Sequence, residues 1–292
     1  MPLLHTSVEP SLKNIVVATD FSPVSLSALN YILPIARESG SMIHIVHVIQ
    51  PREMDIDGYV QAQRDLMRLE PVVGSIPHQI HLCEGRAWRE VENLVRSEHI
   101  DLIVAGTSGK PGIKKFFLGS VADEIFRNAT CPVLTIGSHI SATDHTSPLA
   151  QILYVTKLFE DSHQGLQYAI SLAHQHQSQL TLLHVVEQEY TNPSDHELLR
   201  AYHRLLRNLL NGKADGLSEK PVLRIETSKQ SAARILEVAV EIKADLMVMD
   251  VHPEKPWAAH LHDRVYEIVS WANCPVLTVR TSTEPALSRE EM

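Results

Sequence analysis

Cysteines and long apolar runs are both scarce in this chain of 292 residues. The three cysteines, Cys83, Cys131 and Cys274, are an odd number, are widely spaced and lie in or beside apolar segments. This pattern favours reduced core thiols over disulfides or a metal site. No apolar run approaches the roughly 20 residues that cross a bilayer, and the N-terminal segment is too short and too weakly charged for a secretory signal. We therefore expect a cytoplasmic protein.

An excess of positive charge is also missing, because 26 Lys and Arg residues stand against 35 Asp and Glu residues and the formal net charge is −9. Nucleic-acid-binding surfaces need clustered Lys and Arg, so this balance argues against a nucleic-acid partner. A small anion can still bind locally. With 44% hydrophobic residues and no biased tract, each half of the chain has enough apolar side chain for a buried core, which argues against disorder.

What the chain does contain is an internal repeat. The matched segments are 14–19 with 151–156, 45–49 with 182–186, 101–104 with 245–248, and 128–135 with 271–278. The spacing between matched segments changes by only a few residues, and these insertions fall between the segments, where loops are expected. The linker 137–148 and the tail from 281 are polar. The repeat predicts two domains, at residues 10–138 and 149–281.

Within each copy, short apolar runs alternate with stretches of helical periodicity, a pattern that predicts βαβ units and a parallel sheet in an α/β fold. The predicted strands are 14–19, 42–49, 78–83, 101–106 and 132–136, and then 151–156, 179–186, 221–226, 245–250 and 275–279. The runs are apolar nearly throughout, so we expect helices on both faces of the sheet. A helix near 86–98 is predicted from the spacing of its apolar residues Trp88, Val91, Leu94 and Val95.

A glycine-rich segment follows the fourth strand of the first copy. Its pattern is Gly106, two residues, Gly109, nine residues, and then Gly119 followed by Ser120. In doubly wound sheets, ligands bind beyond the carboxyl ends of the strands, where the strand order reverses. Glycines at that place let backbone N–H groups approach phosphate oxygens, which a Cβ atom would obstruct. The segment therefore suits a phosphate-binding loop.

A helix is predicted to begin at Ser120. The sequence Ser120-Val121-Ala122-Asp123 has the form of a capping box, and the free N–H groups and positive dipole end of such a helix attract an anion. Lys110, in the same loop, could add positive charge. A second interpretation also fits these residues, namely a tight turn and a capped helix with solvated lysines.

On these residues the chain resembles a tandem universal stress protein, over about residues 13–280. Gly106, Gly109, Gly119 and Ser120 match the nucleotide motif of that family without a gap. The resemblance implies that Asp20, at the end of the first strand, hydrogen-bonds the ribose and that the backbone of Val48 reads the adenine. The implied ATP-binding set is Asp20, Val48, Gly106, Thr107, Gly109, Lys110, Gly119, Ser120 and Val121. Asp20 could instead be only the cap of the next helix, for which Ser22 also competes.

The resemblance also implies the details of the fold. Each copy should be a five-stranded, doubly wound domain of the nucleotide-binding alpha-hydrolase-like type, with strand order 3-2-1-4-5. The last strands of the two domains should pair across a pseudo-twofold axis, which gives an intramolecular pseudo-dimer. A homodimer of whole chains remains open, and no protein partner is named by the sequence.

The second copy departs from the motif at each side-chain position. Its residues there are Lys157, Asp250, Pro253, His262 and Asp263, in place of Asp20, Gly106, Gly109, Gly119 and Ser120. A carboxylate about 4 Å from a phosphate costs about 4 kcal/mol at an effective dielectric constant of about 20. Pro253 also removes a backbone donor. We therefore expect ATP in the first domain only.

Histidines in the same loop of the second copy suggest one other chemistry. His252, His260 and His262, with Asp263, could ligate zinc. However, the chain has 17 scattered histidines, and these three lack a recognised ligand spacing. His47 and His184 occupy equivalent strand positions and are expected to be packed inside.

Three functions are compatible with the sequence. The first is an ATP-binding regulatory or stress-response module, in which nucleotide occupancy biases conformation or partner choice. The second is a slow ATPase or nucleotide-dependent transferase, and the third is a structural dimerisation protein with a vestigial pocket. Asp20 and Ser120 offer ligands for Mg²⁺, but no general base, Gly-Lys-Ser/Thr loop or arginine finger is apparent. The sequence therefore favours binding, with at most weak ATP hydrolysis.

Overall fold

The computed structural model describes residues 12–50, 56–107, 120–137, 140, 149–158, 163–187, 196–251 and 259–280, with backbone only at 120 and 259–263. The strands are β1 (Asn14–Ala18), β2 (Met42–Ile49), β3 (His78–Glu84), β4 (Leu102–Gly106), β5 (Val133–Ile136), β6 (Gln151–Val155), β7 (Gln179–Glu187), β8 (Val222–Ser228), β9 (Leu246–Val251) and β10 (Val276–Arg280). The helices are α1 (Pro23–Ser39), α2 (Ile56–Met67), α3 (Glu70–Val73), α4 (Ala87–Ser97), α5 (Ser120–Asn128), α6 (Gln164–His176), α7 (His196–Leu210), α8 (Ser231–Glu241) and α9 (Ala259–Trp271). Every predicted strand is present, with each bound within two residues of the prediction.

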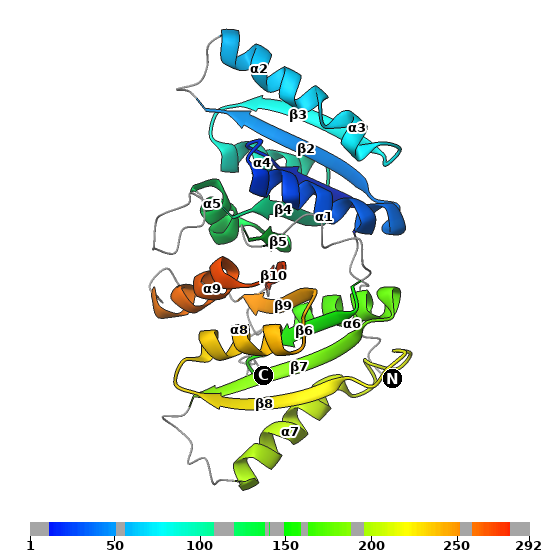
Figure 1. Ribbon diagram of the computed structural model, residues 1–292, viewed down its shortest axis with the longest axis vertical. Coiled ribbons are helices and arrows are strands. Elements are labelled where there is room, and N and C mark those ends of the chain that lie inside the picture. The colour runs from blue at the N-terminus through cyan, green and yellow to red at the C-terminus, as the bar shows by residue number, and fades with distance from the viewer. Residues whose placement is uncertain are drawn as a thin grey trace, which may run out of the picture.

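The ten strands form one sheet that runs the length of the molecule (Figure 1). Their order is β3-β2-β1-β4-β5-β10-β9-β6-β7-β8, so each half has the predicted order 3-2-1-4-5. Pairing is parallel within each half and antiparallel only between β5 and β10. The predicted doubly wound α/β fold is confirmed.

Helices cover both faces of the sheet, as the apolar strands require. In the first half, α1 packs on one face against side chains such as Val17, Ile45 and Val104. On the other face, α4 and α5 pack against Val16 and Ile103. The predicted helix near 86–98 is α4. Successive strand residues are therefore buried on alternate faces, which explains why the strands carry few polar side chains.

The two halves repeat their hydrogen bonds as well as their strands. Asp101 Oδ2 accepts from the backbone N–H groups of residues 13–14, at 2.8 and 3.0 Å. Asp245 Oδ2 accepts in the same way from residues 150–151, at 2.9 and 2.8 Å. These matching contacts align Asp101 with Asp245 and residues 13–14 with 150–151, in agreement with the repeat in the sequence.

The halves meet where β5 and β10 run side by side in opposite directions (Figure 1). Leu134 pairs with Leu277 at the centre of this ladder. On either side, Thr135 Oγ1 donates to Val276 O and Thr278 Oγ1 donates to the carbonyl of residue 133, both at 3.2 Å. The pairing expected between the last strands is therefore confirmed, and the contacts obey a pseudo-twofold relation.

The cysteines lie as the sequence predicts. All three are free thiols; Cys274 is buried, and Cys83 and Cys131 are partly buried. Burial raises the pKa of Cys131 to about 11 and that of Cys274 to about 12. Neither is a reactive thiolate near neutral pH. Among the described helices, none combines the length and apolar character that would cross a membrane.

Candidate functional site

The strand order of the first half reverses between β1 and β4. These two strands are neighbours, with Ala18 opposite Ala105, yet the helices that follow them, α1 and α5, lie on opposite faces. We call the carboxyl ends of β1 and β4, residues 19–22 and 106–107, the first switch point. The ends of β6 and β9 form the second switch point. Ligands of doubly wound sheets bind at such places.

Asp20 lies directly after β1 and is exposed. Its Oδ1 accepts from Ser22 N at 3.0 Å. Ser22 is the N-cap of α1, because its side chain accepts from Ser25 N and Pro23 follows at the first helical position. The helix is therefore capped by Ser22 and not by Asp20. Partial burial works to raise the pKa of Asp20, but hydrogen bonds, chiefly from Ser22, outweigh it, and the pKa lies below the usual value.

Phe21 has a left-handed backbone, with φ at 60°, which is rare for a residue other than glycine. Its N–H donates to Thr19 Oγ1 at 3.0 Å, and its ring lies 4.4 Å from that of His47. His47 in turn places Nδ1 2.8 Å from Thr19 O, and His184 makes the same contact with Thr156 O in the second half. His184 is buried as expected, whereas His47 is only half-buried. The turn that presents Asp20 is thus held by local contacts.

Val48 lies in the part of β2 that extends beyond the end of β1. The pairing of β1 with β2 stops at Val46, whose carbonyl accepts from Thr19 N, whereas β2 continues to pair with β3 as far as Ile49. The backbone of Val48 is therefore beside the first switch point, on the side where β1 has already ended. This is the placement that adenine recognition by a backbone would need.

Gly106 ends β4 directly against the first turn of α1. A Cβ atom built there would lie 2.8 Å from the backbone N of Ser25 and from the backbone C of Val24. The absence of a side chain thus has a packing cause within the protein. The next residue, Thr107, is buried, and its N–H donates to Ile136 O at 2.8 Å. That N–H is committed to the sheet and cannot serve a phosphate.

The predicted helix α5 begins at Ser120. Val121 is half-buried against the core below β4, and Asp123, expected as part of a capping box, has its carboxylate bonded to Arg127 and Tyr266. Gly109, Lys110 and Gly119 lie outside the described residues, as does the side chain of Ser120.

The second switch point is built differently. Asp250, the counterpart of Gly106, is 8% exposed, and its two oxygens accept from Gly165 N at 2.7 Å and from Tyr154 OH at 2.6 Å. His163 Nδ1 lies 3.3 Å from the same hydroxyl. The expectation of a carboxylate near the phosphate position stays a prediction, but this carboxylate is already engaged by donors of the protein itself. The Asp250 carboxylate is turned inward and caps the first turn of α6.

Sequence reasoning missed these partners of Asp250, although a signal was present. Tyr154 is a phenol inside a strand that is aliphatic from Ile152 to Val155 apart from it, at the position that Val17 holds in β1. A buried tyrosine hydroxyl needs a polar partner. Gly165 leaves room for this carboxylate, because a Cβ atom there would lie 3.0 Å from Asp250 Oδ1.

The zinc alternative falls largely outside the described structure. His252 and Pro253 are not described, and neither are the side chains of His260, His262 and Asp263. Among the residues that are described, no group of three or more His, Cys, Asp or Glu side chains is placed to hold a metal ion.

The fold and its two switch points define a tandem of doubly wound α/β domains joined edge to edge. A family model for the universal stress protein family matches residues 11–137 and 149–280. The chain therefore belongs to the universal stress protein family.

Relatives of known sequence resemble one half at a time. Universal stress protein MJ0531 of Methanocaldococcus jannaschii is 30% identical over 143 residues, covering 42% of this chain and 81% of its own. Universal stress protein A homolog 1 of Coxiella burnetii is 30% identical over 138 residues, covering 42% of this chain and 95% of its own. A crystal structure of a universal stress protein from Archaeoglobus fulgidus covers 93% of this chain and all of its own, with a TM-score of 0.71 and 18% identity. That similarity shows that the tandem arrangement of the fold is shared.

Proposed function

We propose that this protein is an adenine-nucleotide-binding regulatory module that holds ATP at the first switch point only. Domain 1, residues 10–138, would carry the nucleotide, and domain 2, residues 149–281, would carry none. One observation supports this division most strongly: glycine lies at the end of β4, whereas a buried, hydrogen-bonded carboxylate occupies the matching place at the end of β9.

The described residues at the first switch point suit the proposed ligand. The carboxylate of Asp20 is exposed and, with its lowered pKa, ionised at neutral pH, so it can accept hydrogen bonds from ribose hydroxyls. The backbone of Val48 lies beyond the end of β1, where an adenine could pair with it. Gly109, Lys110, Gly119 and the backbone of Val121 are proposed to surround the phosphates. Mg²⁺ prefers oxygen ligands, and Asp20 and Ser120 are the candidates to supply them.

The second switch point lacks these features. Gly165 N, a first-turn donor of α6, is already bonded to the chain's own Asp250. The buried carboxylate, which also accepts from Tyr154, fills the end of β9, where the first half has only Gly106. Lys157 stands where Asp20 would be needed for the ribose. The second half is therefore proposed to be structural.

Binding is favoured over efficient hydrolysis by the chemistry of Asp20. A general base works best when its pKa lies near the working pH. The pKa of Asp20 is lowered from a value that is already acidic, which makes this carboxylate a poor base at neutral pH. The alternative function, slow ATP hydrolysis, is tested by single-turnover kinetics with labelled ATP. A rate well above the uncatalysed background would favour the enzyme.

The proposal is tested by calorimetric titration of the full chain with Mg·ATP. We expect the wild type to bind, Asp20→Asn to bind more weakly through loss of a charged acceptor, and Lys157→Asn to bind like the wild type. Lys157→Asn is the matched control because it changes the same position of the second half. No binding by the wild type would support the remaining alternative, a dimerisation protein with a vestigial pocket.

A further inference from the structure

Helix α5 is shared between the two halves. Ile125 and Ala129 pack in the core of the first half. Ala122 and Phe126, on another face of the same helix, belong to the core of the second half, and the Phe126 ring lies 5.1 Å from that of Tyr266 in α9. Figure 1 shows α5 and α9 next to each other where the halves meet. The position of α5 therefore depends on the second half.

A polar contact joins the first turn of α5 to the second half. Tyr266 of α9 donates its hydroxyl to Asp123 Oδ1. Arg127 places Nε 3.0 Å from Asp123 Oδ2, and its guanidinium lies over the Tyr266 ring, 5.8 Å from the ring centre. Burial, together with Asp123, raises the pKa of Tyr266 to about 12, so its hydroxyl remains a donor at neutral pH. The carboxylate of Asp123 is thus held at the boundary between the halves by its contacts with Tyr266 and Arg127.

A second contact holds the other end of α5. Arg280, the last residue of β10, donates from Nη2 to Arg127 O at 2.5 Å and to Phe126 O at 3.3 Å. Carbonyl groups in the last turn of a helix lack partners within the helix, and a cation there also meets the negative end of the dipole. The second half therefore anchors α5 at both ends.

These contacts are not reciprocated. Asp123 and Tyr266 occupy the same position of the repeat, so one acceptor and one donor meet across the pseudo-twofold relation. The counterpart of Arg280 is Gly137, which has no side chain to return the contact to α9. On the face of the sheet opposite to α5, Tyr31 of α1 donates across the boundary to Asp245 O at 3.4 Å. The second half thus holds α5 by polar contacts that the sequence does not repeat in the other direction.

We propose that Tyr266 and Arg280 are positioning residues for the nucleotide site of the other half. This inference rests on the proposed function, in which the N-terminal turn of α5 meets the phosphates. Free N–H groups at a helix N-terminus bind an anion only when the helix is correctly placed. Asp123 lies in that first turn, so its charge would weaken phosphate binding unless Tyr266 and Arg127 engage it. A half without a motif of its own would then still be required for binding.

The test is a titration of the full chain with Mg·ATP, comparing the wild type with Tyr266→Phe and Arg280→Met. Each variant removes one or two hydrogen bonds to α5, and we expect each to raise the Kd by about threefold to tenfold. Arg280→Lys keeps a positive charge and N–H donors but not the planar guanidinium, so it should recover part of the affinity. Tyr31→Phe is the matched control, because it removes a hydroxyl from the same boundary on the face of the sheet opposite to α5, and its Kd should equal that of the wild type.

Thermal unfolding of the same proteins separates positioning from general stability. We expect Tyr31→Phe and Tyr266→Phe to lower the Tm by similar small amounts, while only Tyr266→Phe changes the Kd. If the wild type binds and both Tyr266→Phe and Arg280→Met keep its Kd, this inference is overturned and the proposed function still stands. Failure of the wild type to bind would overturn the proposed function and this inference with it.

Discussion

Gly106 and Asp250 occupy the same place in the repeat. Each determines how the end of its strand packs against a helix, which is α1 in the first half and α6 in the second. In the first half the strand end lies directly on the backbone of α1, and in the second half a carboxylate lies between strand and helix. The two residues cannot be exchanged without changing this packing. Their difference therefore has structural consequences that can be measured apart from any ligand.

The substitution Gly106→Ala should destabilise the protein. The new Cβ atom would lie 2.8 Å from backbone atoms of Val24 and Ser25, so the start of α1 would have to shift. We expect a loss of about 1–3 kcal/mol in the free energy of unfolding, as for other overpacked sites. Urea unfolding followed by circular dichroism measures it. An unchanged midpoint would show that α1 does not rest on this glycine.

Asp250→Asn should also be destabilising. One carboxylate oxygen accepts from Tyr154 OH and the other from Gly165 N, whereas an amide has a single oxygen and would turn its NH₂ group toward one of these donors. A loss of about 1–3 kcal/mol is expected. Glu219→Gln, at an exposed carboxylate, is the control and should change the stability little. Equal stability of the two variants in chemical unfolding would contradict the buried capping role of Asp250.

Histidine burial predicts a pH dependence. Burial lowers the pKa of His44, the neighbouring His81 lowers it further, and Glu98 opposes them. The pKa of His81 is lowered by burial as well. In the unfolded chain these two histidines are protonated near pH 6.5, whereas in the folded protein their protonation needs a lower pH. Their contribution to the free energy of unfolding is therefore fully present above about pH 6.5 and is lost as the pH falls below it.

His44→Thr tests this dependence with the residue that the second half carries at the matching position, Thr181. When the pH is lowered from about 7.5 to 5.5, the variant should lose less stability than the wild type, because unfolding no longer frees His44 to take up a proton. Unfolding measured across this range provides the comparison. Parallel stability profiles for the two proteins would show that His44 does not contribute.

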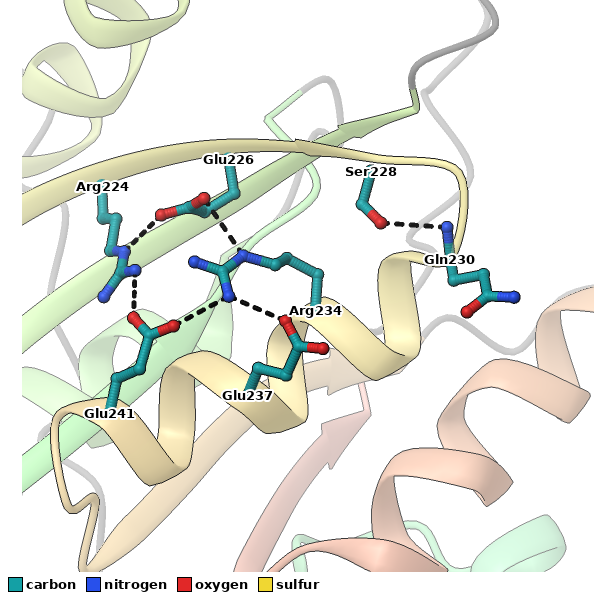
Figure 2. A network of polar contacts seen from close by, with 7 residues as sticks. All are labelled: Arg224, Glu226, Ser228, Gln230, Arg234, Glu237 and Glu241. Atoms are coloured by element: carbon teal, nitrogen blue, oxygen red, sulfur yellow. Dashed lines mark hydrogen bonds and ion pairs between the residues drawn. The ribbon is translucent and has the colours of Figure 1, made fainter.

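Among the elements, β8 and α8 are joined by a network of charges that the first half lacks (Figure 2). Arg234 contacts Glu226 at 3.1 Å and both Glu237 and Glu241 at 2.8 Å. Arg224 contacts Glu226 from the strand and Glu241 of the helix. At the positions of Arg224, Glu226 and Arg234, the first half has His81, Cys83 and Glu90. The network fastens an edge strand of the sheet to the helix that covers it.

Replacing Arg234 with Met should loosen this connection. Three carboxylates would lose their shared cation, and we expect a loss of about 1 kcal/mol at low ionic strength, which is the size of partly exposed ion pairs. Salt screens such charges, so the difference from the wild type should shrink at high salt. A deficit that stays constant between low and high salt would point to lost packing instead.

Most of the strands could be predicted because they are short, nearly continuous apolar runs that recur in the second copy. The edge strands β3 and β8 are more polar, with His81 in the first and Arg224 and Glu226 in the second. The switch points could be placed for the same reason, since their position follows from strand order. The contacts of Asp250 could not, because its partners Tyr154 and Gly165 are 96 and 85 residues away in sequence and meet it only in the folded sheet. Spacing within a loop carries no information on such partners.

At the scale of the whole molecule, one continuous sheet joins a half that keeps the nucleotide motif to a half that has replaced it. The boundary between them is symmetric in its backbone, with Leu134 opposite Leu277, but asymmetric in side chains such as Asp123 and Tyr266. A symmetric dimer of first halves would bring two copies of Asp123 together. Fusion into one chain allows complementary residues at equivalent positions.

The central claim is that ATP occupies one half only. Native mass spectrometry of the full chain in excess Mg·ATP counts the bound nucleotides directly. We predict a single adenine nucleotide per chain, whose occupancy at limiting Mg·ATP falls in Asp20→Asn and is unchanged in Lys157→Asn. Two nucleotides per chain, or one that survives Asp20→Asn and disappears in Lys157→Asn, would contradict the account.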